Sequence, residues 1–276
     1  MMRSLWTAAS GMRAQQVNVD TIANNVANIN TICYKSQQAS FKSLLYQNLQ
    51  STLTNNAGEN KPVAAEVGLG SRVAAITSTF TQGNLTHVEN PFSVALEGDG
   101  FFQIRTESGE LQYTRDGSFE ISPVANGNML CTSDGNPVLD AYGNQIILPS
   151  NRVATDLVVN QDGTLAFPDG TGNPAVITDA NGRPVKFGIY QFNNPAGLSK
   201  EGSNNYSVTV ASGAAVAENG NAAVKQTKTH QYYTEASNVD VANEMVNLIV
   251  AQRAYEMNSK AIQASDEMMQ QANALR

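Results

Sequence analysis

The histidines and cysteines are the most obvious candidates for chemistry in this chain, but they are far apart in the sequence. His87 and His230 have no Cys, Asp or Glu at the spacing of metal ligands, which argues against a zinc site. Cys33 and Cys131 lie far apart, and two unpaired thiols are favoured over a disulfide. We therefore expect no catalytic, cofactor-binding or metal-binding residues, and no enzyme.

The aspartates beside glycines have a simpler explanation than calcium binding. Asp162, Asp169 and Asp179 do not have the alternating carboxylate spacing of a calcium loop, and aspartates bonded to their own backbone are common in turns. The Gly98-Asp99-Gly100 run lacks the third glycine of a dinucleotide-binding loop. These residues predict tight turns between strands.

The composition excludes two classes of partner. The formal net charge is −7 with no basic run, which argues against nucleic acid. No stretch approaches the roughly 20 apolar residues of a membrane span, and residues 1–7 lack the apolar core of a signal peptide. Only 15% of residues are charged, against about 25% in a usual soluble domain. A polar, weakly charged surface suits a protein that packs against its own copies.

Glycine and proline divide the chain into segments. Residues 1–57 contain only Gly11 and no proline, and residues 221–276 contain neither type. Because both residues interrupt helices, the ends are expected to be helical and the middle rich in strands and turns. We expect a helical assembly segment at 1–47, a connector at 48–70, a β-rich core and outer domain at 71–225, and a second helical assembly segment at 226–276.

Apolar residues repeat every seven positions at both ends, as in a coiled coil. Ser237 or Asn238 is expected to cap the C-terminal helix. The fold class is thus α+β, with long terminal helices forming a coiled coil and a turn-punctuated β-rich centre. The stripes predict an assembly interface of Leu5, Met12, Val19, Ile22, Val26, Ile29, Val241, Leu248, Tyr255, Ile262 and Met269.

Three ordered blocks resemble the flagellar basal-body rod and hook family. The first is Met2-Arg3-Ser4-Leu5-Trp6 with Ile22-Ala23-Asn24-Asn25-Val26-Ala27-Asn28, and the second ends in Tyr113-Thr114-Arg115-Asp116-Gly117. The third includes Ser237-Asn238-Val239-Asp240 and Gln252-Arg253-Ala254-Tyr255-Glu256. The chain departs from the family pattern at Cys33, where glycine is usual, and at Gln231-Tyr232-Tyr233, where a glycine-aromatic step is usual.

The resemblance implies a structural subunit of the distal rod that assembles with its own copies into a helical tube and transmits torque from motor to hook. Neighbouring rod and hook proteins are the implied partners, with the surrounding basal-body rings a further possibility. Export without a cleavable signal peptide and a place in the basal body are also implied. Two alternatives stay open: a proximal rod or hook subunit, and, from another class, a secreted β-rich enzyme or sugar-binding module.

Overall fold

The computed structural model divides the chain into two compact units. It describes residues 2–50, 65–124, 127–150, 152–168, 174–178, 182–221 and 224–274. The helical unit comprises Met1–Ala27, Gln37–Thr79 and Asp240–Arg276, and the β unit comprises Asn28–Ser36 and Phe80–Val239. Each unit is therefore built from segments that are distant in the sequence.

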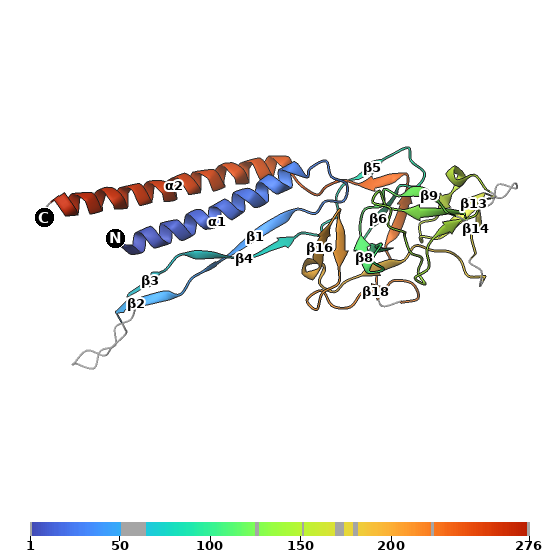
Figure 1. Ribbon diagram of the computed structural model, residues 1–276, viewed down its shortest axis with the longest axis horizontal. Helices are drawn as coiled ribbons and strands as arrows, with labels where there is room; N and C mark the ends of the chain where they lie inside the picture. Colours follow the sequence, from blue (N-terminus) through green and yellow to red (C-terminus); the bar gives the residue numbers. More distant parts are fainter. Residues whose placement is uncertain are drawn as a thin grey trace. The chain divides into compact units, whose positions relative to one another are not determined.

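The helical unit contains two long helices and two β-ribbons. Helix α1 (Met2–Ala27) contacts both α2 (Val241–Ala274) and the ribbon of β1 (Gln37–Ser43) and β4 (Ser71–Ser78), so it lies between them (Figure 1). Strands β2 (Tyr46–Gln50) and β3 (Ala65–Gly68) form the second ribbon. The predicted α+β class with long terminal helices is confirmed.

The helix boundaries differ from the sequence expectations in two places. Asp240, and not Ser237 or Asn238, caps α2, because its Oδ1 accepts hydrogen bonds from the Ala242 and Asn243 backbone N–H groups at 3.0 and 3.4 Å. The segments 1–47 and 226–276, expected to be helical, also contain strands, since a lack of glycine and proline is compatible with both structures. Within the expected connector at 48–70, residues 51–64 lie outside the described part of the chain.

The β unit contains several small antiparallel sheets. The largest has six strands in the order β16-β17-β8-β7-β15-β18, and the others have the orders β11-β10-β9, β12-β13-β14, β19-β6 and β20-β5. The strands are β5 (Leu85–His87), β6 (Val94–Glu97), β7 (Phe101–Arg105), β8 (Leu111–Thr114), β9 (Glu120–Val124), β10 (Gly127–Cys131), β11 (Ile147–Leu148), β12 (Val158–Val159), β13 (Leu165–Pro168), β14 (Pro174–Val176), β15 (Ile189–Gln191), β16 (Ser199–Gly202), β17 (Asn205–Ser207), β18 (Val216–Ala217), β19 (Lys228–Gln231) and β20 (Tyr233–Glu235).

Strand β7 separates two apolar clusters. Successive side chains of a strand point to opposite faces, so Phe102 enters one cluster and Phe101 the other. The Phe102 ring packs edge-on against Phe119 and Phe187, with centroid distances of 5.0 and 5.4 Å. The turn expected at Asp162 has positive φ at Gly163, and the Asp134-Gly135 turn has positive φ at Gly135, as hairpin turns of this kind require.

A buried carboxylate joins three segments of the β unit. Glu235 Oε1 lies 2.6 Å from Lys35 Nζ, and Glu235 Oε2 lies 3.3 Å from Arg115 Nε, with all three side chains almost fully buried. Lys35 Nζ also donates to the Thr81 carbonyl at 2.8 Å. Desolvation and the neighbouring Arg115 charge lower the Lys35 pKa, whereas the Glu235 carboxylate opposes that shift. The residues just after α1 and just before α2 in the sequence are thereby held to one core.

Two non-glycine residues in the segments where the sequence departs from the resembled pattern adopt the left-handed conformation. Cys33 has φ 57° and Tyr232 has φ 64°. The Cys33 thiol donates to the Arg115 carbonyl at 2.9 Å, and burial raises its pKa. Both cysteines are free and buried, which confirms the prediction of unpaired thiols. A side chain costs about 1–2 kcal/mol in this backbone conformation, so both sites carry local strain.

Replacing Tyr232 by glycine is expected to stabilise the β unit. The Tyr232 side chain is exposed and its ring makes a long stacking contact with His87, with centroids 6.4 Å apart, so little packing is lost. Strain relief offset by glycine's extra unfolded-state entropy leaves about 0.5–1 kcal/mol of added stability. Urea unfolding followed by circular dichroism measures this. Tyr233→Gly, at a neighbour with ordinary strand geometry, should instead destabilise; equal effects of both changes would contradict the strain argument.

Glu235→Gln is expected to destabilise the β unit by about 3–5 kcal/mol. The change leaves the Lys35 and Arg115 charges buried without a counter-ion. The half-exposed carboxylate of Glu97, which contacts His230 Nε2 at 2.7 Å, provides the control. Glu97→Gln should hardly move the urea midpoint, because exposed pairs contribute little. Similar midpoints for both variants would show that the buried pair does not stabilise the unit.

Candidate functional site

The two terminal helices meet along a seam of small and polar residues. The hydroxyls of Ser4 and Ser265 lie 3.3 Å apart, and Asn25 Nδ2 donates to Glu244 Oε1 at 2.9 Å. Between these contacts, a Cβ placed on Gly11 would lie 2.9 Å from Asn258 Nδ2. Each step of seven along α1 is thus matched by a step of seven back along α2, which makes the helices antiparallel.

Asn25 is the most heavily bonded residue of this seam. It is 1% exposed, and its side-chain amide also donates to the Gln37 carbonyl at 2.8 Å, while its Oδ1 accepts from the Gln37 N–H at 2.8 Å. One side chain therefore joins α1 to both α2 and β1. Asn25 belongs to the first of the three blocks that resemble the rod and hook family, and these bonds give it a physical role.

The opposite side of α1 approaches the β1–β4 ribbon closely. Ser10 Oγ accepts from the Ser71 N–H at 3.3 Å, and a Cβ on Gly70 would lie only 2.0 Å from that oxygen. Gly70 has φ 113°, a second reason for glycine at this position. Helix α1 is therefore covered on two sides within the helical unit.

The predicted interface residues lie mostly beside the seam. Ile22 is buried, whereas Leu5, Met12, Val19, Val26, Leu248, Ile262 and Met269 are half-buried. Tyr255 and Val241 are more exposed, at 43% and 40%. Val19 and Tyr255 share a groove of about 420 Å³ with Gln16, Gln252 and Glu256. Ile29 follows α1 and belongs to the β unit, so the structure does not place it on the helix pair.

A second apolar face of α2 was not among the predicted residues. We call it the outer stripe, and it consists of Met245, Val246, Ile249, Val250, Met257 and Met268, each at least half exposed. The step from Val250 to Met257 is seven residues, and Val246 lies one turn before Val250. The sequence signal for this face is that the first turns of α2 carry apolar residues on more than one side of the helix. A single heptad register does not explain this pattern.

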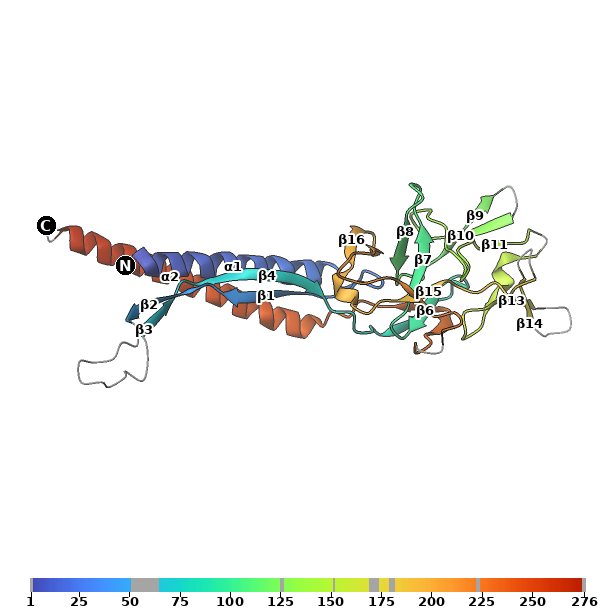
Figure 2. The same cartoon turned by 90° about the horizontal axis from the view of Figure 1, so that it is seen from below.

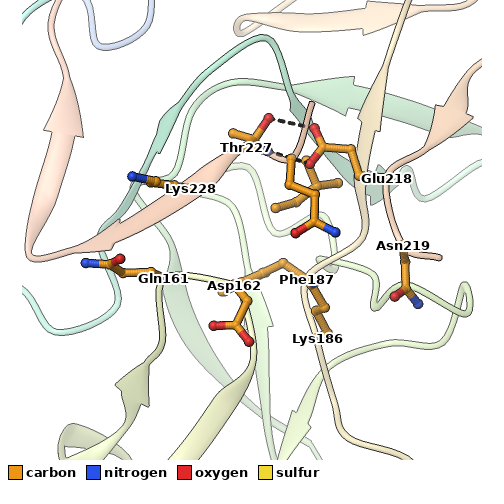
Figure 3. A pocket seen from close by; sticks show the side chains of 10 residues that line it. Gln161, Asp162, Lys186, Phe187, Glu218, Asn219, Thr227 and Lys228 are labelled. Carbon is orange, nitrogen blue, oxygen red and sulfur yellow. Dashed lines mark hydrogen bonds between the residues drawn. The ribbon is translucent and has the colours of Figure 1, made fainter. Parts of the chain in front are cut away.

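A pocket in the β unit was the strongest candidate for an enzyme site. It encloses about 250 Å³ and is lined by Asp162, Lys186 and Glu218 among others (Figure 3). The Glu218 carboxylate accepts hydrogen bonds from the Thr227 N–H and hydroxyl at 2.8 and 2.6 Å, and from Gln191 Nε2 at 2.7 Å. All three donors belong to the chain itself, so the Glu218 carboxylate serves as a structural hydrogen-bond acceptor. Among the described residues, no three His, Cys, Asp or Glu side chains converge as a metal site would require.

Comparison with known proteins identifies the family to which the helices and the β unit both belong. Family models match residues 5–35 (flagella basal body rod protein), 95–167 (flagellar hook protein FlgE/F/G D1 domain) and 230–275 (flagellar basal body rod FlgEFG protein C-terminal). The flagellar basal-body rod protein FlgG of Borreliella burgdorferi is 42% identical over 100% of this chain and 99% of its own length. The chain belongs to the flagellar basal-body rod protein family.

Other members of the family show the same full-length similarity. The flagellar basal-body rod protein FlgG of Caulobacter vibrioides is 38% identical over 100% of both chains. The flagellar hook-basal body complex protein FlhP of Bacillus subtilis is 32% identical, again over 100% of both chains. The chain is accordingly a structural subunit of the flagellar basal-body rod and not an enzyme, as predicted. No helix in the described ranges has the length and apolar character that crossing a membrane requires.

Enlarging Gly11 is expected to weaken the helix pair specifically. Gly11→Leu inserts a bulky side chain where Asn258 already lies, and overpacking of this kind costs about 1–3 kcal/mol. Thermal unfolding of the monomer, followed at 222 nm, should show an earlier loss of helix while the β unit is unchanged. Ala23→Leu, on the exposed side of α1, is the matched control. Equal melting curves for the two variants would show that α1 and α2 do not pair in the monomer.

Proposed function

We propose that this subunit builds the distal part of the rod, as a helical tube that transmits torque from motor to hook. The resemblance of Arg3-Ser4-Leu5-Trp6 to the distal rod protein supports the distal position. In this proposal the helical units of successive copies pack together as an inner coiled-coil tube, and the β units form the outer layers. Neighbouring rod and hook proteins contact its ends, and the basal-body rings surround it. Export without a cleavable signal peptide, implied by the resemblance, belongs to the same proposal.

The outer stripe is the observation that carries this proposal. The polar seam already holds α1 against α2 through Ser4, Asn25 and their partners. The outer stripe is not needed for that pairing, because its side chains remain exposed, Met257 at 70% and Val250 at 61%. Exposed apolar faces of this kind typically mark interaction surfaces. The predicted stripe of Leu248, Tyr255 and Ile262 then contributes both to the pairing of α1 with α2 and to the contact between subunits. It borders the seam and is only partly covered.

A hook or proximal rod subunit is the second candidate, because the matching models name hook as well as rod proteins. The two candidates differ in the assembled product. Electron micrographs of tubes grown from purified protein distinguish them: straight tubes support a rod, and curved, supercoiling tubes support a hook.

A charge on the outer stripe is expected to block assembly without unfolding the subunit. Val250→Asp would bury a carboxylate in the subunit contact, which costs several kcal/mol, yet Val250 is exposed in the monomer. The sedimenting product should therefore disappear while the thermal unfolding curve of the monomer is unchanged. Ile262→Asp, beside the seam, should lower the melting temperature of the monomer as well.

Val210→Asp is the matched control, because Val210 is a fully exposed valine in the β unit. It makes the same chemical change and should leave sedimentation at the wild-type level. A Val250→Asp subunit that still assembles at wild-type concentrations would refute the role of the outer stripe.

A further inference from the structure

A hollow lies between α1 and the β1–β4 ribbon in the helical unit. It has a volume of about 590 Å³ and is lined by Trp6, Ala9 and Val17 from α1, by Val73 from β4, and by Leu44 just after β1. Figure 2 shows α1 running alongside β4. Trp6, the only tryptophan, is 75% exposed, so a large apolar ring stands uncovered at this groove. We call this surface the α1–ribbon groove.

The charged residues lining the α1–ribbon groove are both cationic. Arg13 extends from α1 and Arg72 from β4, and no acidic side chain is among the lining residues. An apolar floor beside two guanidinium groups fits a partner that presents apolar side chains next to carboxylates.

Helix α2 presents such a surface on its outer stripe. Glu256-Met257 and Glu267-Met268 repeat the same dipeptide eleven residues apart, which is close to three helical turns. The two pairs therefore lie on nearly the same side of α2, and both methionines are exposed. Glu256 makes an exposed pair with Arg253 at 2.9 Å, which costs little to exchange for another partner. Methionine adapts to irregular apolar grooves better than branched side chains do.

We propose that the α1–ribbon groove of one subunit receives the outer stripe of α2 from a second copy of this chain, with Met257 and Met268 against Trp6 and Glu256 and Glu267 toward Arg13 and Arg72. This inference rests on the proposed function and names the surface that the outer stripe binds. A subunit's own α2 cannot fill the groove, because its seam residues Asn258 and Ser265 face α1 and turn the outer stripe away.

The proposed contact is head-to-tail, because groove and stripe are different surfaces. Such a contact leaves a free groove at one end and a free stripe at the other, so it propagates into an open assembly. A symmetric contact of stripe against stripe would bring the carboxylates of the two copies together and would close after two subunits.

Photo-cross-linking tests which surfaces meet. A benzoylphenylalanine placed at Trp6 should cross-link to peptides from residues 256–274 when the full-length protein assembles. Mixing isotopically heavy and light subunits before assembly separates links between copies from links within one copy. A mixed heavy-light link to residues 256–274 supports the proposal, and a link within one copy, or to any other segment of the second copy, overturns it.

A mixing experiment tests the head-to-tail arrangement. The groove variant Arg13→Glu/Arg72→Glu and the stripe variant Met257→Asp/Met268→Asp are exposed-site changes, and each should raise the concentration needed for assembly by about tenfold or more. Mixed together, the stripe of the first can still enter the groove of the second, so one-to-one dimers should appear in sedimentation velocity. Circular dichroism first establishes that both variants are folded.

The outcomes separate this inference from the proposed function. If the stripe variant fails to assemble and the mixture stays monomeric, the outer stripe is an assembly surface that binds elsewhere, and the groove is overturned as its partner. If the stripe variant assembles normally, the proposed role of the outer stripe fails as well. Restored assembly in Arg72→Glu/Glu267→Arg, against its loss in Arg72→Glu, supports direct pairing of these charges, and no restoration overturns it.

Discussion

The buried carboxylate of Glu235 is the constraint on which the β unit depends. It lies between Lys35, from the segment that follows α1, and Arg115, from the segment between β8 and β9, and water cannot screen any of the three charges. Breaking one contact leaves a buried charge without its partner. We therefore expect the three segments to fold together. The chain thereby accommodates Cys33 and Tyr232 in a strained backbone conformation, because the surrounding contacts determine their geometry.

The helical unit has two kinds of helix surface, a small and polar seam and an exposed apolar face. Small and polar residues, Ser4, Gly11 and Asn25 on α1 with Glu244, Asn258 and Ser265 on α2, hold the helices together. Large apolar residues remain outside this seam, where they are available to other subunits. A monomer built this way can fold without burying the surface that we propose for assembly. The low share of charged residues fits this arrangement, because weak like-charge repulsion favours repeated packing of identical surfaces.

The sequence by itself determined the fold class and the family, whereas the two units of the structure have bounds that the predicted segments do not match. The distribution of glycine and proline indicated that each end of the chain contains a helix, and Asp-Gly steps indicated turns, because both depend on local backbone preferences. The three family blocks needed no structure to be noticed, and the absence of catalytic spacing between His87 and His230 already favoured a structural protein. Glycine and proline did not reveal the strands β1, β2, β19 and β20, because a helix and a strand are equally free of them.

Only the tertiary structure decided which face of each helix is covered. A heptad pattern shows that α2 has an apolar stripe but not whether the partner is α1 or another copy, and α2 is apolar on more than one side. The register that sets Ser4 against Ser265 and Asn25 against Glu244 depends on residues more than 200 positions apart. The Lys35–Glu235–Arg115 contact is equally invisible in the sequence. Charged residues there give no local sign of burial, since only the meeting of distant segments removes them from water.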